Sequence, residues 1–319
     1  MKKNPVTTLI QKLSGKKWLK WALMALAAIF LLVLPMTTTK YKVLVIDFGI
    51  LAAITVLGLV VLVGFTGQLT LGQIAYYAIG SYTVGILYTR FGVSPWIGVI
   101  LGTAVAALCG VIVGLPAFNL RGPFLAIITI SFYEIVYILL TNLSEFTGGP
   151  FGLQGIAGLT IGDFNVSKQI PFYYFTLALL LLIVIGVLRL RRSRVGRSMI
   201  AVMNDETASP MLGVNPRSVK LVSFGLAAGL AGLAGALYAT CASFIVPEAF
   251  TSSNSSLYLA MSVISGFNAW LAPVVAVVLN MLPELMRELE EYYLLVFSIV
   301  LIVVIMVSAW RQYKANNDN

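Results

Sequence analysis

Long apolar runs separated by short polar segments dominate the chain. A transmembrane helix needs about 20 mostly apolar residues, and runs near this length recur along the whole sequence. They lie at about 20–36, 43–65, 70–89, 96–116, 122–142, 171–190 and 219–243, followed by a split pair at about 255–267 and 269–284 and a last run at 293–310. The pattern predicts an all-α, polytopic membrane protein with about ten transmembrane helices.

The composition agrees with this class, and the cations give an orientation. Of the 319 residues, 59% are hydrophobic and only 10% are charged, whereas soluble domains carry about 25% charged residues. The net charge is +9, but the cations gather in short segments that flank apolar runs. This placement is typical of cytoplasmic loops and not of nucleic-acid binding. We therefore expect a cytoplasmic N-terminus and C-terminus and no nucleic-acid partner.

The same pattern predicts how the chain is organised. We expect a basic cytoplasmic tail at 1–19, one transmembrane domain at 20–310 and a cytoplasmic tail at 311–319. Two longer polar segments interrupt the domain, an external loop at about 143–170 and a cytoplasmic loop at about 190–218.

Glycines and polar side chains interrupt the apolar pattern between Gly64 and Gln73. Irregular backbone at membrane depth survives only where it is buried in protein or lines a cavity, so this segment predicts a broken helix of the kind that builds transport paths. The candidate pathway residues from this segment are Gly67, Gln68, Thr70 and Gln73. Glu134, an acid within the span at 122–142, is the fifth candidate.

Two carboxylates fall within predicted spans. Glu134 lies in the middle of its span and is expected to face the bundle interior, because a charge facing lipid is costly. It is either a pathway residue or a structural carboxylate bonded to a neighbouring helix, and the sequence leaves both open. Asp47 lies near the start of its span, where solvation by water is the simpler expectation.

Small residues four apart recur along the span at 219–243. Such pairs let helix backbones approach closely in lipid, and they predict a tightly packed helix. The pairs are Gly225–Gly229, Ala228–Gly232 and Ala231–Gly235.

The most basic interval of the chain runs from Leu188 to Lys220. Beyond its arginines an apolar stripe at i, i+3 and i+4 predicts a short helix, formed by Met199, Val202 and Met203. This helix would either dock in a groove of a soluble partner or lie on lipid headgroups.

Turn chemistry predicts a second, shorter turn after this helix. Asn204 or Asp205 offers a break or a cap, and Thr207 is expected to cap a second turn that carries Pro210. Gly213 is expected to end that turn in a left-handed conformation.

No motif for chemistry on this chain is present. The sequence has no histidine, no phosphate-binding GxxxxGK[ST], no HExxH and no CxxC, and its two cysteines, Cys109 and Cys241, lie in apolar runs. We expect no enzyme activity, no metal and no cofactor of its own, so any ATP chemistry belongs to another chain.

Four stretches resemble one family. They are GFTGQLTLGQIAYYAIGSYT (64–83), LRGPFLAIITISFYEIV (120–136), FTGGPFGLQGI (146–156) and the segment from Arg194 to Ala239. With these in order, the chain resembles the permease subunits of branched-chain amino acid ABC importers, and most closely the longer of the two sister permeases. The likeness covers about 45–310.

This resemblance implies an assembly and a function. Permeases of this kind pair with a sister permease (or with a second copy of themselves), two cytoplasmic ATPase subunits that bind ATP and an external solute-binding protein, in the cytoplasmic membrane of bacteria. The chain would import leucine, isoleucine or valine by alternating access. Urea or a short amide is the alternative substrate; a membrane-embedded lipid-modifying enzyme and a purely structural subunit are more remote alternatives.

The resemblance also assigns roles to residues. The family's coupling helix, which enters a groove on the ATPase, corresponds here to Gly196, Arg197, Asp205, Glu206 and Gly213. The external docking loop corresponds to Gly148, Gly149 and Pro150.

Two departures from the family pattern affect shape. The glycine run expected after the eighth span is replaced within 265–273, where Gly266 and Pro273 alone keep the pattern. Pro210 stands where related loops continue a helix, so the coupling element is not expected to be one continuous helix.

Overall fold

The computed structural model describes residues 38–116, 123–161 and 164–285, together with the single positions 35, 302 and 306. Contacts divide the chain into residues 1–44 and 45–319, and the packing described below is that of the second unit. The two tails and, apart from those single positions, the spans expected at about 20–36 and 293–310 lie outside the described residues.

The long helices follow the predicted spans closely. They are α3 (Lys40–Thr66), α4 (Gln73–Phe91), α5 (Pro95–Gly114), α6 (Pro123–Asn142), α8 (Gln169–Arg192) and α10 (Pro216–Ala242), and the predicted split pair forms α11 (Ser252–Ile264) and α12 (Leu271–Leu285). Among the described residues, 5 helices (α3, α5, α6, α8 and α10) are long and apolar enough to cross a membrane. The chain is therefore a mostly helical membrane protein.

Short elements fill the two polar segments. Those of the expected external loop and of the turn after α10 are α7 (Ser144–Thr147), η2 (Gly149–Phe151), β1 (Leu153–Gln154), β2 (Thr160–Ile161), β3 (Phe164–Asn165), β4 (Phe244–Ile245) and η4 (Pro247–Ala249). Those of the expected cytoplasmic loop are α9 (Arg194–Asn204) and η3 (Ser209–Leu212).

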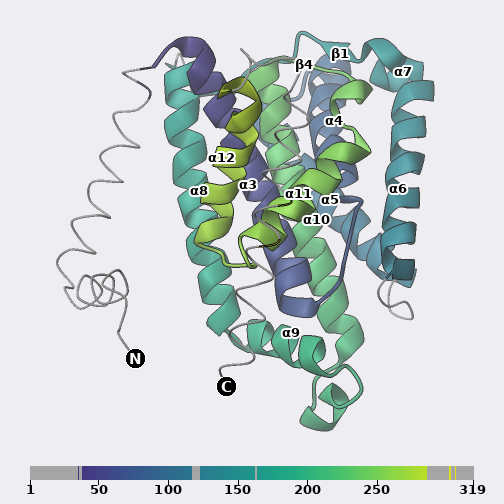
Figure 1. Cartoon of the computed structure of the whole chain (residues 1–319). Helices are drawn as coiled ribbons and strands as arrows, with labels where there is room; N and C mark the ends of the chain where they lie inside the picture. The colour runs from purple at the N-terminus through teal and green to yellow at the C-terminus, as the bar shows by residue number, and fades with distance from the viewer. Residues whose placement is uncertain are drawn as a thin grey trace, which may run out of the picture. The chain divides into compact units, whose positions relative to one another are not determined.

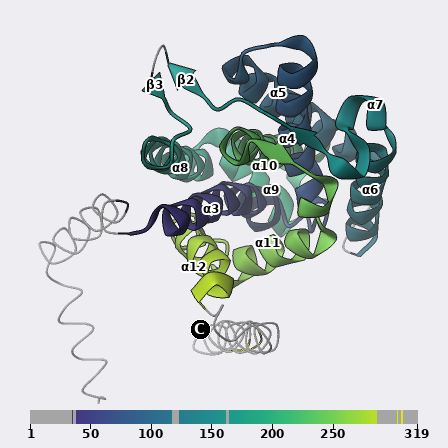
Figure 2. The same ribbon diagram turned by 90° about the horizontal axis from the view of Figure 1, so that it is seen from above.

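Helix α10 packs at backbone distance against its neighbours. A Cβ at Gly232 would lie 2.2 Å from the Cβ of Ala106 on α5, and a Cβ at Gly235 would lie 1.9 Å from the carbonyl oxygen of Tyr77 on α4. Figure 2 shows α10 among α3, α4 and α5. The tight packing predicted from the small-residue pairs is confirmed, since any side chain at these glycines would separate the helices.

The two polar segments lie at opposite ends of α8 and α10. Helix α8 leads from the loop at 143–168 to α9, and α10 returns from η3 to β4 (Figure 1). Strand β4 pairs antiparallel with β1 of that loop, with Leu153 opposite Ile245. With 27 residues, α10 is about 40 Å long, which exceeds the hydrocarbon core of about 30 Å.

The turn between α11 and α12 has a left-handed backbone at one glycine and at one residue that is not glycine. Gly266 has φ +61° and Phe267 has φ +55°. For a residue with a Cβ this conformation costs about 1–2 kcal/mol. Phe267 also lies against α3, because a Cβ at Gly64 would come within 2.6 Å of its Cβ.

Replacing Gly235 with valine tests the packing of α10. The added atoms meet the backbone of Tyr77 and cannot be accommodated by a rotamer change, so we expect a stability loss of about 3 kcal/mol. Thermal unfolding of the purified protein, followed by size-exclusion fluorescence, measures it. Gly186→Val is the matched control, because nothing lies within 4 Å of a Cβ at that position on α8. Equal unfolding temperatures for the two variants would contradict the close approach.

Candidate functional site

A break in the helical backbone separates α3 from α4. Helix α3 ends at Thr66 because Gly67 takes a left-handed conformation, with φ +70°. Residues 67–72, here called the break segment, are non-helical. The backbone N–H groups of Leu71 and Ile74 donate to the hydroxyl of Thr129 on α6 (3.1 Å) and of Ser255 on α11 (2.9 Å). The predicted broken helix is confirmed. Its N–H groups are satisfied partly by these two helices and partly by the end of α3, where Gly67 and Gln68 donate to the Val63 and Leu62 carbonyls.

The polar side chains of the break segment and the first residue of α4 have different roles. The Thr70 hydroxyl accepts a hydrogen bond from the Gly72 N–H (3.3 Å), and the Gln73 amide nitrogen donates to the Ala227 carbonyl of α10 (2.9 Å). Both side chains are buried and hold the break in place. Gln68 is also buried, yet both polar atoms of its amide lack a hydrogen-bond partner in the described structure.

The coupling segment, residues 194–213, begins at a tight corner with α8. The Ser193 hydroxyl caps α9 by accepting from the Gly196 N–H at 3.2 Å. A Cβ at Gly196 would lie 2.0 Å from the Leu190 carbonyl oxygen, so glycine is required for this close approach. Arg197 is exposed and donates to the Arg192 carbonyl at 2.7 Å.

The second half of the coupling segment is shaped by Asp205. Its Oδ1 accepts from the Thr207 N–H (2.8 Å), the Thr207 hydroxyl (2.6 Å) and the Ala208 N–H (3.0 Å). The cap expected at Thr207 is therefore formed by Asp205, because its carboxylate reaches both free N–H groups. Pro210 lies near the start of the 3-10 helix η3, and Gly213 ends it with φ +74°, as predicted.

The apolar stripe of α9 packs largely against other parts of this chain. Met199 and Val202 are 0% and 4% exposed, and the side chain of Met203 contacts the break segment, where a Cβ at Gly67 would lie 3.5 Å from its Cγ. Two of the three stripe residues are thus covered by this chain, and Met203 is 48% exposed. The docking of the stripe in a partner's groove stays a prediction, with only Met203 left accessible to a partner. The most exposed apolar residues of the coupling segment are Met211 and Leu212 of η3, at 90% and 75%.

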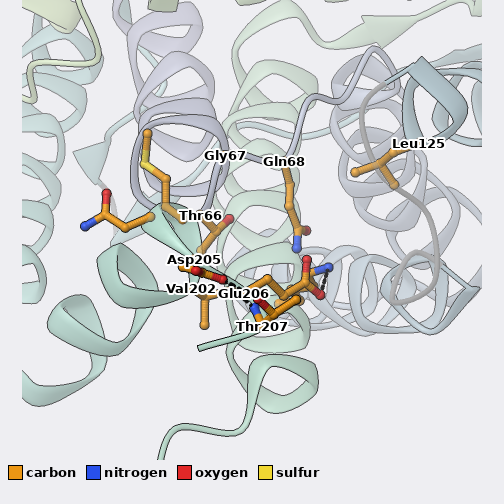
Figure 3. A pocket seen from close by; sticks show the side chains of 11 residues that line it. Thr66, Gly67, Gln68, Leu125, Val202, Asp205, Glu206 and Thr207 are labelled. Atoms are coloured by element: carbon orange, nitrogen blue, oxygen red, sulfur yellow. Dashed lines mark hydrogen bonds and ion pairs between the residues drawn. The ribbon is translucent and has the colours of Figure 1, made fainter. Parts of the chain in front are cut away.

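The break segment and the coupling segment share one pocket of about 360 Å³ (Figure 3). It is lined by Thr66 at the end of α3, by Gly67 and Gln68 of the break segment, by Leu125 of α6, by Val202 to Thr207 of the coupling segment and by Lys220 of α10. The sequence predicted Gly67, Gln68, Asp205 and Glu206 for two separate roles, and the structure brings them together here.

Two of the residues that line this pocket form an ion pair. The Lys220 Nζ lies 2.6 Å from the Glu206 Oε1, and Lys220 is only 4% exposed. A buried ammonium needs such a counter-charge, because desolvation of an uncompensated ion is costly. The Glu206 carboxylate therefore faces α10, and its side chain stays 24% exposed. Sequence analysis missed Lys220, although a lysine inside the second turn of an apolar helix is itself a signal for a buried partner.

Both intramembrane carboxylates differ from expectation. Glu134 is exposed on the outer face of α6 and does not reach the pocket, so the expectation that it faces the bundle interior is wrong. Asp47 is 0% exposed, with its Oδ1 3.5 Å from the Thr176 hydroxyl. Its expected solvation is also wrong, because α3 is enclosed by other helices over most of its length.

The predicted docking loop lies at the other end of the described unit. Gly148 and Gly149 both have positive φ, at +75° and +60°, and they turn the chain from α7 into η2 with the Thr147 hydroxyl accepting from the Gly149 N–H. Pro150 is exposed, and the next residue, Phe151, is 84% exposed. The loop therefore exposes an apolar side chain, that of Phe151, which the sequence analysis did not select as a candidate.

The described residues combine apolar helices of spanning length with a broken helix and a polar pocket at one end, an arrangement typical of helical membrane transport proteins. Residues 43–306 match the family described as branched-chain amino acid transport system / permease component. The chain belongs to this family.

Curated relatives carry the same description. The high-affinity branched-chain amino acid transport system permease protein LivM of Escherichia coli (strain K12) is 36% identical over 279 residues, and that of Salmonella typhimurium is 37% identical; each match covers 80% of this chain and 65% of the relative. The chain thus spans less than two thirds of these relatives' length. The fructose import permease protein FrcC of Rhizobium meliloti is 26% identical over 284 residues, covering 82% of this chain and 77% of the relative. No solved structure matches.

A double-mutant cycle tests the ion pair. We expect Glu206→Gln and Lys220→Met each to lower stability by about 1–3 kcal/mol, and their coupling energy to be about 1–3 kcal/mol. Thermal or denaturant unfolding in detergent measures all four proteins. The control cycle pairs Glu206→Gln with Arg217→Met, an exposed cation three residues before Lys220 on the same helix, and should show no coupling. Additive effects of Glu206→Gln and Lys220→Met would disprove the pair.

Proposed function

We propose that the chain is the transmembrane permease subunit of an ABC importer that moves branched-chain, aliphatic amino acids into the cell by alternating access. The observation that carries this proposal is the pocket shared by the coupling segment and the break segment in a member of this permease family. The names of the relatives at 36% and 37% identity support the substrate class. ATP is bound by separate ATPase subunits.

The proposed topology has about ten spans, with both termini cytoplasmic, in the cytoplasmic membrane of a bacterium. The coupling segment is the cytoplasmic side, and the loop at 143–168 is the external side. Two observations support this: the segments lie at opposite ends of α10, and α8 ends in Arg189, Arg191 and Arg192 where it meets the coupling segment. Arginines at a span's end favour the cytoplasm.

The proposed partners are assigned from the exposed side chains. Met211 and Leu212 at the tip of η3 would insert into a groove of one ATPase subunit, since exposed methionine and leucine side chains are poorly suited to water. Phe151 and Pro150 would meet the external solute-binding protein. A sister permease completes the assembly.

The proposed mechanism links these partners through the pocket. A displacement of η3 by the ATPase is carried by α9 to Gly67 through Met203, and to α10 through the Glu206–Lys220 ion pair. A shift of the break segment would act on α6 and α11, because the N–H groups of Leu71 and Ile74 donate to side chains on these helices. The Gln68 amide then provides an unsatisfied donor and acceptor at the inner end of the path.

Uptake measurements test the function. Membrane vesicles that contain the full complex should accumulate radiolabelled leucine with ATP, and accumulation should fall to background when the ATPase subunits are deleted. Fructose and urea are tested in parallel. Fructose is the sugar named for the more distant relatives, and urea represents the alternative substrate class. Leucine uptake that persists without the ATPase subunits would refute the proposal. Uptake of fructose or urea without uptake of leucine would show that the proposed substrate class is wrong.

Serine substitution of the η3 tip tests the docking surface. Met211→Ser with Leu212→Ser removes two side chains worth about 1.5–3 kcal/mol each when buried, so we expect at least about tenfold less ATPase subunit to co-purify. Val195→Ser is the matched control, because Val195 is 45% exposed on the same segment but away from the tip. Unchanged co-purification in the tip variant would show that the ATPase docks elsewhere.

A further inference from the structure

Among the candidate spans of the described residues, α6 is the one that its own chain covers least. Only 28% of its most apolar window is buried, against 89% for α3. In Figure 2 it lies at the edge of the described helices. Its outward face carries large apolar side chains and two polar ones, and consists of Phe124, Ile127, Ser131, Glu134, Ile135 and Ile138.

The carboxylate on this face lies at membrane depth. Helix α6 runs from Pro123 to Asn142, so Glu134 is about 16 Å along the axis from its first residue and about 12 Å from its last. Neither distance lets a glutamate side chain reach the aqueous boundary of a core about 30 Å thick. The neighbouring exposed residues, Ile127, Ile135 and Ile138, are 55–59% exposed and wholly apolar.

Lipid is an unsuitable cover for this face. An ionisable group in a transmembrane segment is expensive unless it faces protein or water and pairs with a donor. Ser131, one turn before Glu134, adds a second polar group, although its hydroxyl donates to the Ile127 carbonyl at 3.0 Å. A polar strip on an otherwise apolar helix is typical of helix–helix contacts in membranes.

The chemistry of the strip favours a different chain over a second copy of this one. In a two-fold interface the same patch meets itself, which would bring the two Glu134 carboxylates toward each other in a medium of low dielectric. In the described candidate spans the cations lie near helix ends, at Lys40, Lys42, Arg189, Arg191, Arg192, Arg217 and Lys220. Within that part of the chain, a second copy has no cation to offer at mid-depth.

We propose that the outward face of α6 is the contact surface for a second permease chain of different sequence, and that a cation or hydrogen-bond donor at mid-depth of that chain pairs with Glu134. This inference rests on the proposed function, because it names the surface at which the sister subunit joins. It also explains why Glu134 is absent from the pocket.

Site-specific photo-cross-linking identifies what covers α6. A benzoylphenylalanine at Ile135 is activated in native membranes that hold the full complex, and the adducts are identified by mass spectrometry. Leu182, 66% exposed on α8, is the matched control. We expect an adduct with the second permease chain at position 135 and none at position 182. An adduct between two differently tagged copies of this chain, or adducts with lipid alone, would overturn the proposal.

A substitution pair tests the carboxylate itself. Glu134→Leu should lower co-purification of the second permease chain by about tenfold or more, and Glu134→Gln, which keeps hydrogen bonding but removes the charge, should lower it less. A monodisperse peak and unchanged unfolding temperature show that each variant folds. Glu134→Leu with full co-purification would contradict the pairing. ATP-dependent leucine uptake by the wild-type complex is measured in the same membranes, so failure of the function and failure of the interface are distinguished.

Discussion

The need to satisfy backbone hydrogen bonds at membrane depth is the constraint on which this structure depends. Where α3 stops at Gly67, the chain loses its intrahelical partners before α4 begins at Gln73. Water cannot replace those partners in the hydrocarbon core. Hydroxyl groups of α6 and α11 accept from the freed N–H groups, and the Gln73 side chain ties the start of α4 to α10. The break is therefore held by three other helices.

The same low dielectric gives the Glu206–Lys220 pair its importance. An ion pair on a protein surface contributes little to stability. Lys220 is buried, so the loss of Glu206 would leave its charge uncompensated and would cost more. The pair joins the coupling segment to α10, and α10 contacts α4 and α5 through its glycines. Movement of the coupling segment thus has a direct physical route into the helices that surround the break.

Periodicity and composition predicted the elements well because lipid imposes them. Each described span lies within a few residues of its expected position, and the broken helix and the tight helix at 219–243 are confirmed. Which face of an element meets which neighbour was not predictable in the same way. The stripe at Met199 and Val202 indicated a covered face but not what covers it, and the depth of Asp47 in its span did not reveal the helices around it.

Glu134, Asp205 and Phe267 show why local patterns were insufficient. A carboxylate in a span must pair with something, but that partner can belong to another chain. Asp205 and Thr207 were both possible caps of the second turn. Asp205 forms the cap because its Oδ1 accepts hydrogen bonds from three donors. The loss of the family's glycines at 265–273 indicated a changed turn but not its geometry, in which Phe267 takes a left-handed conformation and packs against α3.

The central claim is that the coupling segment and the break segment move as one body when the ATPase works. Spin labels at Leu69 and Met203, both exposed on these two segments, report their separation by pulsed electron double resonance, in a background in which Cys109 and Cys241 are replaced by alanine. A second pair joins Met203 to Phe151 at the opposite end. Within the full complex, we predict one unchanged distance for the first pair and a shift for the second pair when ATP binds. A first pair whose distance changes as much as that of the second would contradict the claim.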